Sequence, residues 1–126
     1  AHNDLHTPHE TLCADAFTAL AKERRRFGVV VIDPPAFAQR ERDVPRALDA
    51  YARLCRLGLD ALSEGGHLVL ASCSSRVGKE AFRDAVVNAA KAHGRPLSIQ
   101  RETGHPLDHP ITFPEGAYLK CLYARA

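Results

Sequence analysis

Apolar residues along this chain of 126 residues follow two alternating spacings. Short continuous runs at 29–32 and 67–71 are followed by an Asp-Pro-Pro sequence and by serines, respectively, and such runs are typical of buried strands in a parallel sheet. The first run holds four β-branched residues, so we expect both of its faces to be covered. Two further strands are predicted near 97–101 and over 118–123.

Between these runs, apolar residues recur at the three- and four-residue spacing of amphipathic helices. A short helix is predicted over 18–26. A longer helix starts at about residue 46 and stops at Gly65-Gly66, since glycine commonly ends a helix. A third helix surrounds Phe82 and is closed by Gly94.

The alternation of strands and helices predicts an α/β fold, with a mostly parallel sheet and an antiparallel hairpin at the carboxyl-terminal end. We expect a single domain over residues 1–126, in which residues 1–12 form a polar loop. Nucleotide cofactors usually bind at a glycine-rich turn after a strand, and no G-x-G-x-x-G pattern occurs in this chain.

The composition is ordinary for a globular protein, with 45% hydrophobic residues. No apolar run could cross a bilayer and no signal peptide is visible, so we expect a cytoplasmic protein. The net charge of +2 permits a nucleic-acid partner without arguing for one. The four cysteines form no C-x-x-C pair, so neither a metal site nor a disulfide framework is predicted. The absence of methionine suggests an excised piece of a longer chain.

Two predicted turns place reactive side chains at one edge of the sheet. Asp33 follows the first buried strand, and Pro34 and Pro35 prevent that strand from continuing. Cys73 follows the second strand, within the serine-rich turn 72–75. Neighbouring parallel strands lie about 5 Å apart and ligands bind at their carboxyl ends, so a carboxylate and a thiol are expected to share one cleft.

A thiol beside a carboxyl group suits methyl transfer to carbon 5 of a pyrimidine. That carbon is a weak nucleophile until a thiolate adds to carbon 6, which splits one hard step into two. A protonated carboxyl group can hydrogen-bond the ring nitrogen and stabilise the charge that develops there. We expect a helix that starts directly after Ser75, together with Arg76 and Lys79, to favour the thiolate form of Cys73.

Four motifs resemble, in order and spacing, the carboxyl-terminal half of the RlmI-like 23S ribosomal RNA cytosine methyltransferases. They are Asp33-Pro34-Pro35-Ala36-Phe37, Ser72-Cys73-Ser74, Asp108-His109-Pro110 and Pro114-Glu115-Gly116-Ala117-Tyr118-Leu119-Lys120. The resemblance covers nearly the whole chain from Asp15 onward. It implies part of a Rossmann-like class I methyltransferase sheet, without the first strands and the glycine-rich loop. Family members carry these elements, and an RNA-binding domain, before the segment that matches Asp15.

The same resemblance implies an S-adenosylmethionine-dependent enzyme that makes 5-methylcytosine in 23S ribosomal RNA. Cys73 would be the nucleophile, and Asp33 would be the catalytic residue that contacts the target base. Five residues would contact the cofactor and five others the RNA; these are Asp15, Ala16, Phe17, Asp33 and Pro34 for the cofactor, and Pro35, Phe37, Ser72, Ser74 and His109 for the RNA.

Other interpretations of the same residues stay open. The serines of the 72–75 turn could cap a helix, and the 108–110 segment could order the last hairpin or line the cleft. The basic run 22–26 is more typical of a solvated helix end than of a phosphate contact. Asp-Pro-Pro turns also occur in methyltransferases that act on purines or amino groups, although Cys73 and the intervening Ala36 favour cytosine.

A non-catalytic role is a further hypothesis. Without preceding strands, residues 29–32 would lie at an unpaired apolar edge, which proteins usually cover. The chain could therefore form a homodimer through this edge. The histidines His2, His6 and His9 have spacings that a metal could use, but no carboxylate or cysteine completes a site.

Overall fold

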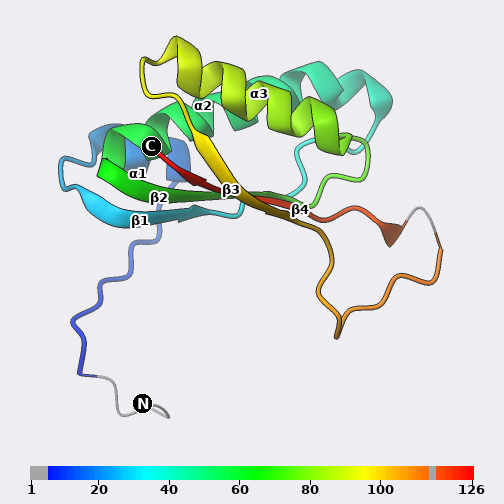
Figure 1. Ribbon diagram of the computed structural model, residues 1–126, viewed down its shortest axis with the longest axis horizontal. Coiled ribbons are helices and arrows are strands. Elements are labelled where there is room, and N and C mark those ends of the chain that lie inside the picture. Colours follow the sequence, from blue (N-terminus) through cyan, green and yellow to red (C-terminus); the bar gives the residue numbers. More distant parts are fainter. Residues whose placement is uncertain (1–5, 114–115) are drawn as a thin grey trace.

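The computed structural model describes residues 6–113 and 116–126, and it has a mixed α/β architecture (Figure 1). His2 and the first two residues of the fourth sequence motif lie outside the described residues. In chain order the elements are α1 (Ala16–Lys22), β1 (Phe27–Ile32), the 3-10 helix η1 (Glu41–Asp43), α2 (Val44–Ala61), β2 (Leu62–Ser72), α3 (Lys79–Ala92), β3 (Ser98–Thr103) and β4 (Lys120–Arg125).

The strands of the described residues form one four-stranded sheet in the order β1-β2-β4-β3. β1 and β2 are parallel, with Ile32 opposite Leu70, whereas β4 runs antiparallel to both of its neighbours. The predicted α/β class is confirmed. Because the last strand lies between β2 and β3, β1 and β2 are the one parallel pair of neighbours in the described sheet.

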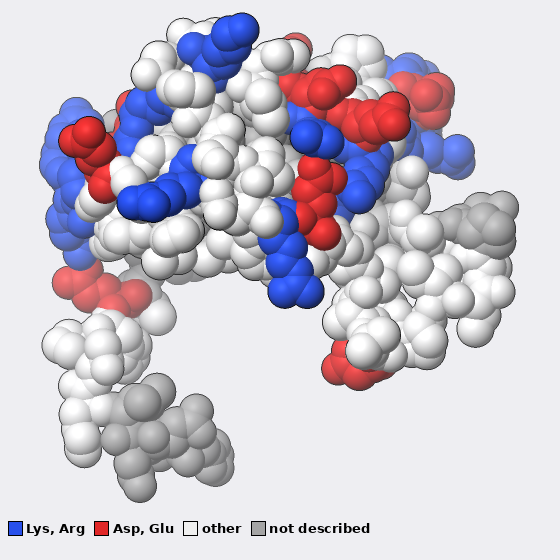
Figure 2. Space-filling view, viewed as in Figure 1, with Lys and Arg blue, Asp and Glu red and all other residues white. Residues whose placement is uncertain are grey.

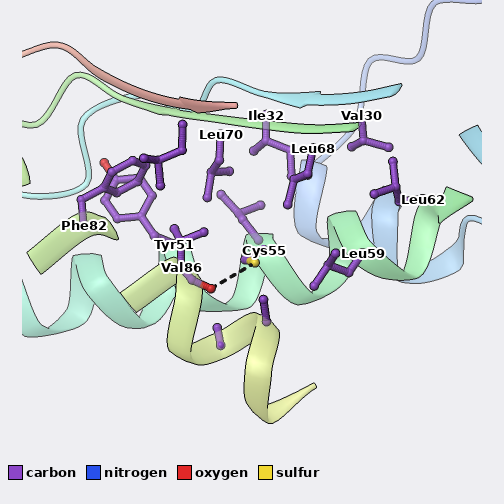
Figure 3. Packing of buried hydrophobic residues seen from close by; sticks show 14 of the residues in the cluster. Val30, Ile32, Tyr51, Cys55, Leu59, Leu62, Leu68, Leu70, Phe82 and Val86 are labelled. Carbon is purple, nitrogen blue, oxygen red and sulfur yellow. Dashed lines mark hydrogen bonds between the residues drawn. The ribbon is translucent and has the colours of Figure 1, made fainter. Parts of the chain in front are cut away.

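The core lies between the sheet and helices α2 and α3, which cover the same face (Figures 1 and 3). Alternate residues of β1, β2 and β4 point to this face, as the two-residue period of a strand requires. The side chains that meet there include Val30, Ile32, Leu68, Leu70 and Leu122 from the strands, and Tyr51, Leu54, Cys55, Leu59, Phe82 and Val86 from the helices.

The opposite face of β1 is open within the described residues. Val29 and Val31 are 58% and 66% exposed, and Tyr123 on β4 is 39% exposed. The expectation that both faces of the first strand are covered is therefore wrong for the described residues. A β-branched run fits the pleated backbone of a strand whether one face or both are packed, so the pattern alone does not distinguish these cases.

The helix ends differ from those predicted where a distant side chain caps the helix. α2 ends at Ala61, and the guanidinium group of Arg95 donates to three backbone oxygens there, two of them at 2.8 and 3.0 Å. The Gly65-Gly66 pair instead lies inside β2, at an irregularity opposite β1. α1 also ends earlier than predicted, at Lys22. Gly94, with a φ of +79°, follows α3 as predicted.

Candidate functional site

The turns that follow β1 and β2 meet at one edge of the sheet, because the two strands are parallel neighbours. The Asp-Pro-Pro turn (residues 33–37) begins with Asp33, which is exposed. In the Cys73 turn (residues 72–77), Cys73 is half-buried and its thiol donates to the backbone oxygen of Pro34, with a sulfur to oxygen distance of 3.8 Å. The structure thus brings the two turns into contact, and the roles of their side chains stay predictions.

A buried network of hydroxyl groups joins the two turns. Ser74 Oγ accepts hydrogen bonds from the backbone nitrogens of Phe37, at 3.0 Å, and Ala38, at 3.4 Å. The hydroxyl group of Tyr51 lies 3.0 Å from Ser74 Oγ and 2.8 Å from Ser72 Oγ. All three hydroxyl-bearing side chains are fully buried. The network therefore fixes the Cys73 turn against the Asp-Pro-Pro turn.

The burial of Ser72 and Ser74 corrects two expectations about them. Neither hydroxyl group reaches the surface, so the predicted direct contact with RNA is not open to them in this structure. Neither serine caps a helix, since α3 begins only at Lys79 and has no side-chain cap. The helix expected directly after Ser75 is displaced because the chain first closes a turn, in which the backbone nitrogen of Val77 donates to the oxygen of Ser74 at 3.2 Å.

Lys120 is a buried polar residue beside Cys73 to which the sequence pattern assigned no role. It is 7% exposed, and its Nζ donates to the backbone oxygens of Ser74, at 2.6 Å, and Val77, at 2.7 Å. Burial lowers the pKa of Lys120, and the negative charge of a Cys73 thiolate raises it. A signal was present in the alternation of β4, where Lys120 shares the inward face with Leu122 at a position typical of an apolar residue.

A hollow of about 830 Å³ lies between α1 and β1. Asp15 is the N-cap of α1, and hydrogen bonds from the side chain and the backbone of Thr18 lower the pKa of its carboxyl group. The wall of the hollow includes every residue that the resemblance assigned to the cofactor, together with two assigned to the RNA: Asp15, Ala16, Phe17, Asp33 and Pro34, and then Pro35 and Phe37.

Phe37 lies between two other aromatic rings in the wall of this hollow. Its ring centroid is 6.3 Å from that of Phe17 and 5.0 Å from that of Tyr51. The guanidinium group of Arg53 lies 4.8 Å from the centre of the Phe17 ring. Phe37 is half-buried and also lines a second hollow, of about 520 Å³, beside α2. The ring is therefore held by α2 and still contributes to the surface of both hollows.

His109 lies in the long connection between β3 and β4, residues 104–119. This connection enters β4 beside the Cys73 turn, because Lys120 pairs with Ser72. The rings of His105 and His109 stack with centroids 5.1 Å apart and an interplanar angle of 12°. The backbone nitrogen of His109 donates to the oxygen of Pro106 at 3.1 Å. Of the two interpretations of the 108–110 segment, these contacts favour a turn that orders the connection.

The basic run lies at the far end of β1 from Asp33. The six residues of β1 separate the two, a span of about 20 Å. Arg25 pairs with Glu10 at 2.8 Å and with Glu23 at 2.9 Å. Figure 2 shows Lys and Arg side chains gathered at this edge of the molecule, on the left of the view. The run therefore belongs to a solvated surface and not to the edge where the two turns meet.

Among the residues that the structure describes, no group of three His, Cys, Asp or Glu side chains is arranged to hold a metal ion. None of the described helices combines the length and the apolar character needed to cross a membrane.

No family model matches the chain. A ribosomal RNA large subunit methyltransferase of Deinococcus radiodurans is 37% identical over 123 residues, which are 95% of this chain and 30% of the relative. Ribosomal RNA large subunit methyltransferase I of Shewanella amazonensis is 36% identical over 131 residues, which cover 99% of this chain and 33% of the relative. This chain is a homologue of the carboxyl-terminal part of the ribosomal RNA large subunit methyltransferase I proteins.

The chain spans about a third of the length of these methyltransferases. A solved structure, SMU.776, described as a methyltransferase complexed with S-adenosylhomocysteine, has a TM-score of 0.74 at 21% identity. It matches over 90% of this chain and 30% of the solved chain. At that identity the likeness concerns the fold, and it agrees with the methyltransferase sheet expected from the sequence.

Proposed function

We propose that this chain is the catalytic carboxyl-terminal portion of an enzyme that methylates carbon 5 of cytosine in 23S ribosomal RNA, using S-adenosylmethionine. The observation that carries the proposal is the contact between the two strand-end turns, with Cys73 Sγ 3.8 Å from the backbone oxygen of Pro34. Homology to ribosomal RNA methyltransferases supports it. A cytoplasmic location, where ribosomes are found, belongs to the same proposal.

The hollow between α1 and β1 fits S-adenosylmethionine. Its volume of about 830 Å³ lies within the usual range for small-molecule sites, roughly 300–1,000 Å³. The wall combines apolar side chains with the carboxyl groups of Asp15 and Asp33, which suits a ligand with an aromatic base and a positive charge. Arg25 and Glu23 also line the hollow, and they form an ion pair with each other at 2.9 Å. The cofactor, when bound, supplies the methyl group. Its proposed contacts on this chain are Asp15, Ala16 and Phe17 from α1 and its cap, and Asp33 and Pro34 from the end of β1.

The proposed reaction uses two side chains of this chain. The thiolate of Cys73 adds to carbon 6 of cytosine, and the electrons of the ring double bond make carbon 5 nucleophilic. The carboxyl group of Asp33 contacts the target base through a hydrogen bond and stabilises the charge that develops on it. After carbon 5 takes the methyl group, S-adenosylhomocysteine would be the leaving product. Loss of the carbon 5 proton to water then restores the ring double bond, and the bond between carbon 6 and the Cys73 sulfur breaks to release the thiolate.

The RNA contacts proposed for this chain come from the exposed side of the site. Pro35 continues the Asp-Pro-Pro turn and is exposed, and the Phe37 ring is held in place by Tyr51. A flat aromatic ring suits stacking on an unstacked base, which is how single-stranded RNA is commonly held. His109 is exposed in the connection that enters β4 beside the Cys73 turn. In this proposal Ser72 and Ser74 contribute indirectly, because their hydroxyl groups hold the Cys73 turn against the Asp-Pro-Pro turn.

Replacing Cys73 by alanine in the full-length protein tests the chemistry. We expect no 5-methylcytosine in the target RNA, measured by mass spectrometry of its nucleosides, because no thiolate can add to carbon 6. Cys13→Ala is the matched control, since Cys13 is exposed and lies in neither turn, and it should keep the wild-type yield. Formation of 5-methylcytosine by Cys73→Ala would contradict the proposal.

Methylation of an amino group or a purine is the enzymatic alternative, and it needs no thiol adduct. The same nucleoside analysis distinguishes the two, because an amino-methylated or purine-methylated nucleoside that persists in Cys73→Ala would favour this alternative. A non-catalytic role would leave every methylated nucleoside unchanged when the protein is deleted from cells.

The edge position of β1 favours a second proposal, a homodimer that pairs through this strand. β1 ends the described sheet, and the exposed side chains of Val29 and Val31 lie along it. An open apolar edge of this kind is usually covered in proteins. Light scattering of a purified chain of residues 1–126 should give twice the mass of one chain, and a monomer over the full concentration range would contradict the proposal.

A further inference from the structure

We propose that Lys120 is a positioning residue for the Cys73 nucleophile, which holds the Cys73 turn in place and presents a positive charge that favours the thiolate. The inference rests on the function proposed above and deepens it. It assigns a role to a residue on β4, a strand that carries none of the side chains proposed to contact cofactor or RNA.

The geometry comes from the pairing of β4 with β2. Lys120 lies opposite Ser72 in the antiparallel register, so its side chain reaches under the turn that follows Ser72. There Nζ donates to the backbone oxygens of Ser74, at 2.6 Å, and Val77, at 2.7 Å. Ser74 directly follows Cys73, and Val77 is the last residue of the turn. The lysine therefore fixes the backbone that carries Cys73.

The burial of Lys120 indicates that its role is more than packing. The buried polar or charged side chains of the described residues are Ser72, Ser74 and Lys120, and all three lie around Cys73. Lysine is almost never buried without a partner, because removing its charge from water is costly. The inward neighbours on β4, Leu122 and Ala124, show that this face is otherwise apolar. A positive charge at this buried position is best explained by a nearby group whose negative charge it stabilises.

Cys73 is the group whose charge couples to that of Lys120. Burial is the main influence on the pKa of Lys120 and lowers it, whereas a Cys73 thiolate raises it. Coupling between two sites is reciprocal in free energy, so an ammonium group at Lys120 favours the thiolate as much as the thiolate favours the ammonium.

Other ionisable groups stand on the elements that meet at this corner. Asp33 directly follows β1. Burial raises the pKa of Cys121 on β4, and the negative charge of Asp33 contributes to raising it further. Within the Cys73 turn Arg76 is exposed. The ammonium group of Lys79, at the start of α3, lies 3.3 Å from a carboxylate oxygen of Glu102 on β3. Lys120 is the buried cation among these groups, and water screens a buried charge least.

The first test measures how fast iodoacetamide alkylates Cys73 as a function of pH, in the full-length protein. Only the thiolate reacts, so the pH midpoint of the rate reports how readily the thiol loses its proton. The tryptic peptide from Leu57 to Arg76 contains Cys73 and no other cysteine, so mass spectrometry follows this site alone. Cys13, which is exposed, serves as the internal reference.

We expect Lys120→Met to slow the alkylation of Cys73 at neutral pH by up to about tenfold, because the buried positive charge beside the turn is lost. Cys13 should react at an unchanged rate. Lys120→Arg keeps the positive charge, so Cys73 in this variant should react at close to the wild-type rate. Ser74→Ala loosens the same turn without removing a charge, so it separates a structural effect from an electrostatic one. Equal midpoints in Lys120→Met and the wild type would overturn the electrostatic role.

A second measurement needs no substitution at Lys120. NMR titration of the labelled side-chain carbon next to Nζ gives the pKa of Lys120 in the wild type and in Cys73→Ser. We expect a lower value in Cys73→Ser, because serine cannot carry the negative charge of a thiolate. Identical titration curves would overturn the inference. Both measurements are independent of methylation. The role of Lys120 can therefore be refuted while Cys73→Ala still abolishes 5-methylcytosine. Conversely, the proposed function can be refuted while the coupling between Lys120 and Cys73 is observed.

Discussion

Replacing Ser74 by alanine removes the hydroxyl group at the centre of the network that joins the two turns. Ser74 Oγ lies 3.0 Å from both the Phe37 nitrogen and the Tyr51 hydroxyl, and 3.4 Å from the Ala38 nitrogen. The two shorter hydrogen bonds contribute about 1 kcal/mol each, and a buried donor left unpaired costs about 1 kcal/mol more. We therefore expect Ser74→Ala to lower the free energy of unfolding by about 2–3 kcal/mol.

Urea denaturation measures the global effect, and amide hydrogen exchange at Phe37 and Ala38 measures the local one. Exchange at Phe37 should become faster in Ser74→Ala, because its N–H loses its acceptor. Ser75→Ala is the matched control, since Ser75 is exposed and should change stability by less than about 0.5 kcal/mol. A loss in Ser74→Ala no larger than that of the control, with unchanged exchange at Phe37, would refute the claim that this network holds the turns together.

Three further predictions concern the core. Gly58→Ala should destabilise the protein by about 1–3 kcal/mol in urea denaturation, because its Cβ would lie 2.8 Å from Ile32 Cδ1 and 3.0 Å from Leu68 Cδ1; a gain in stability, as helix propensity alone predicts, would contradict this. Burial raises the pKa of the Cys55 thiol from 9.0 to about 12, so iodoacetamide at pH 8 should label Cys13 in the native protein and leave Cys55 unlabelled, as peptide mass spectrometry would show. The stability that the neutral Cys55 thiol provides is complete below pH 9 and is lost as the pH rises toward 12. The urea concentration at the unfolding midpoint should therefore fall between pH 9 and pH 12 by more in the wild type than in Cys55→Ala.

The features of the fold that depend on local pattern were predictable from the sequence. The apolar runs identified β1 and the second half of β2, because β-branched and other apolar residues favour the pleated backbone of a strand. The end of α2 was not predictable, since its cap is Arg95, far along the chain. The position of β4 between β2 and β3 was equally hidden, because the period of a strand does not specify its neighbours.

In the candidate site, too, the features set by local pattern were predictable and those set by distant contacts were not. Asp33 and Cys73 could be paired in advance because each directly follows a strand, and parallel neighbours bring their carboxyl ends together. The network beneath them depends on burial, which the sequence does not state. Ser72 and Ser74 were therefore assigned to the RNA although both are enclosed in the protein. Lys120 was left without a role, although a charged residue on the inward face of β4 was a usable signal.

Covalent trapping tests the central claim most directly. RNA that carries 5-fluorocytosine at the target position should form a stable adduct with the full-length protein in the presence of S-adenosylmethionine, because fluorine cannot leave carbon 5 as a proton does. Mass spectrometry should then find the modified nucleotide on the peptide from Leu57 to Arg76, at Cys73. An adduct at another cysteine, or methylation of the natural RNA with no adduct formed on the analogue, would contradict the account.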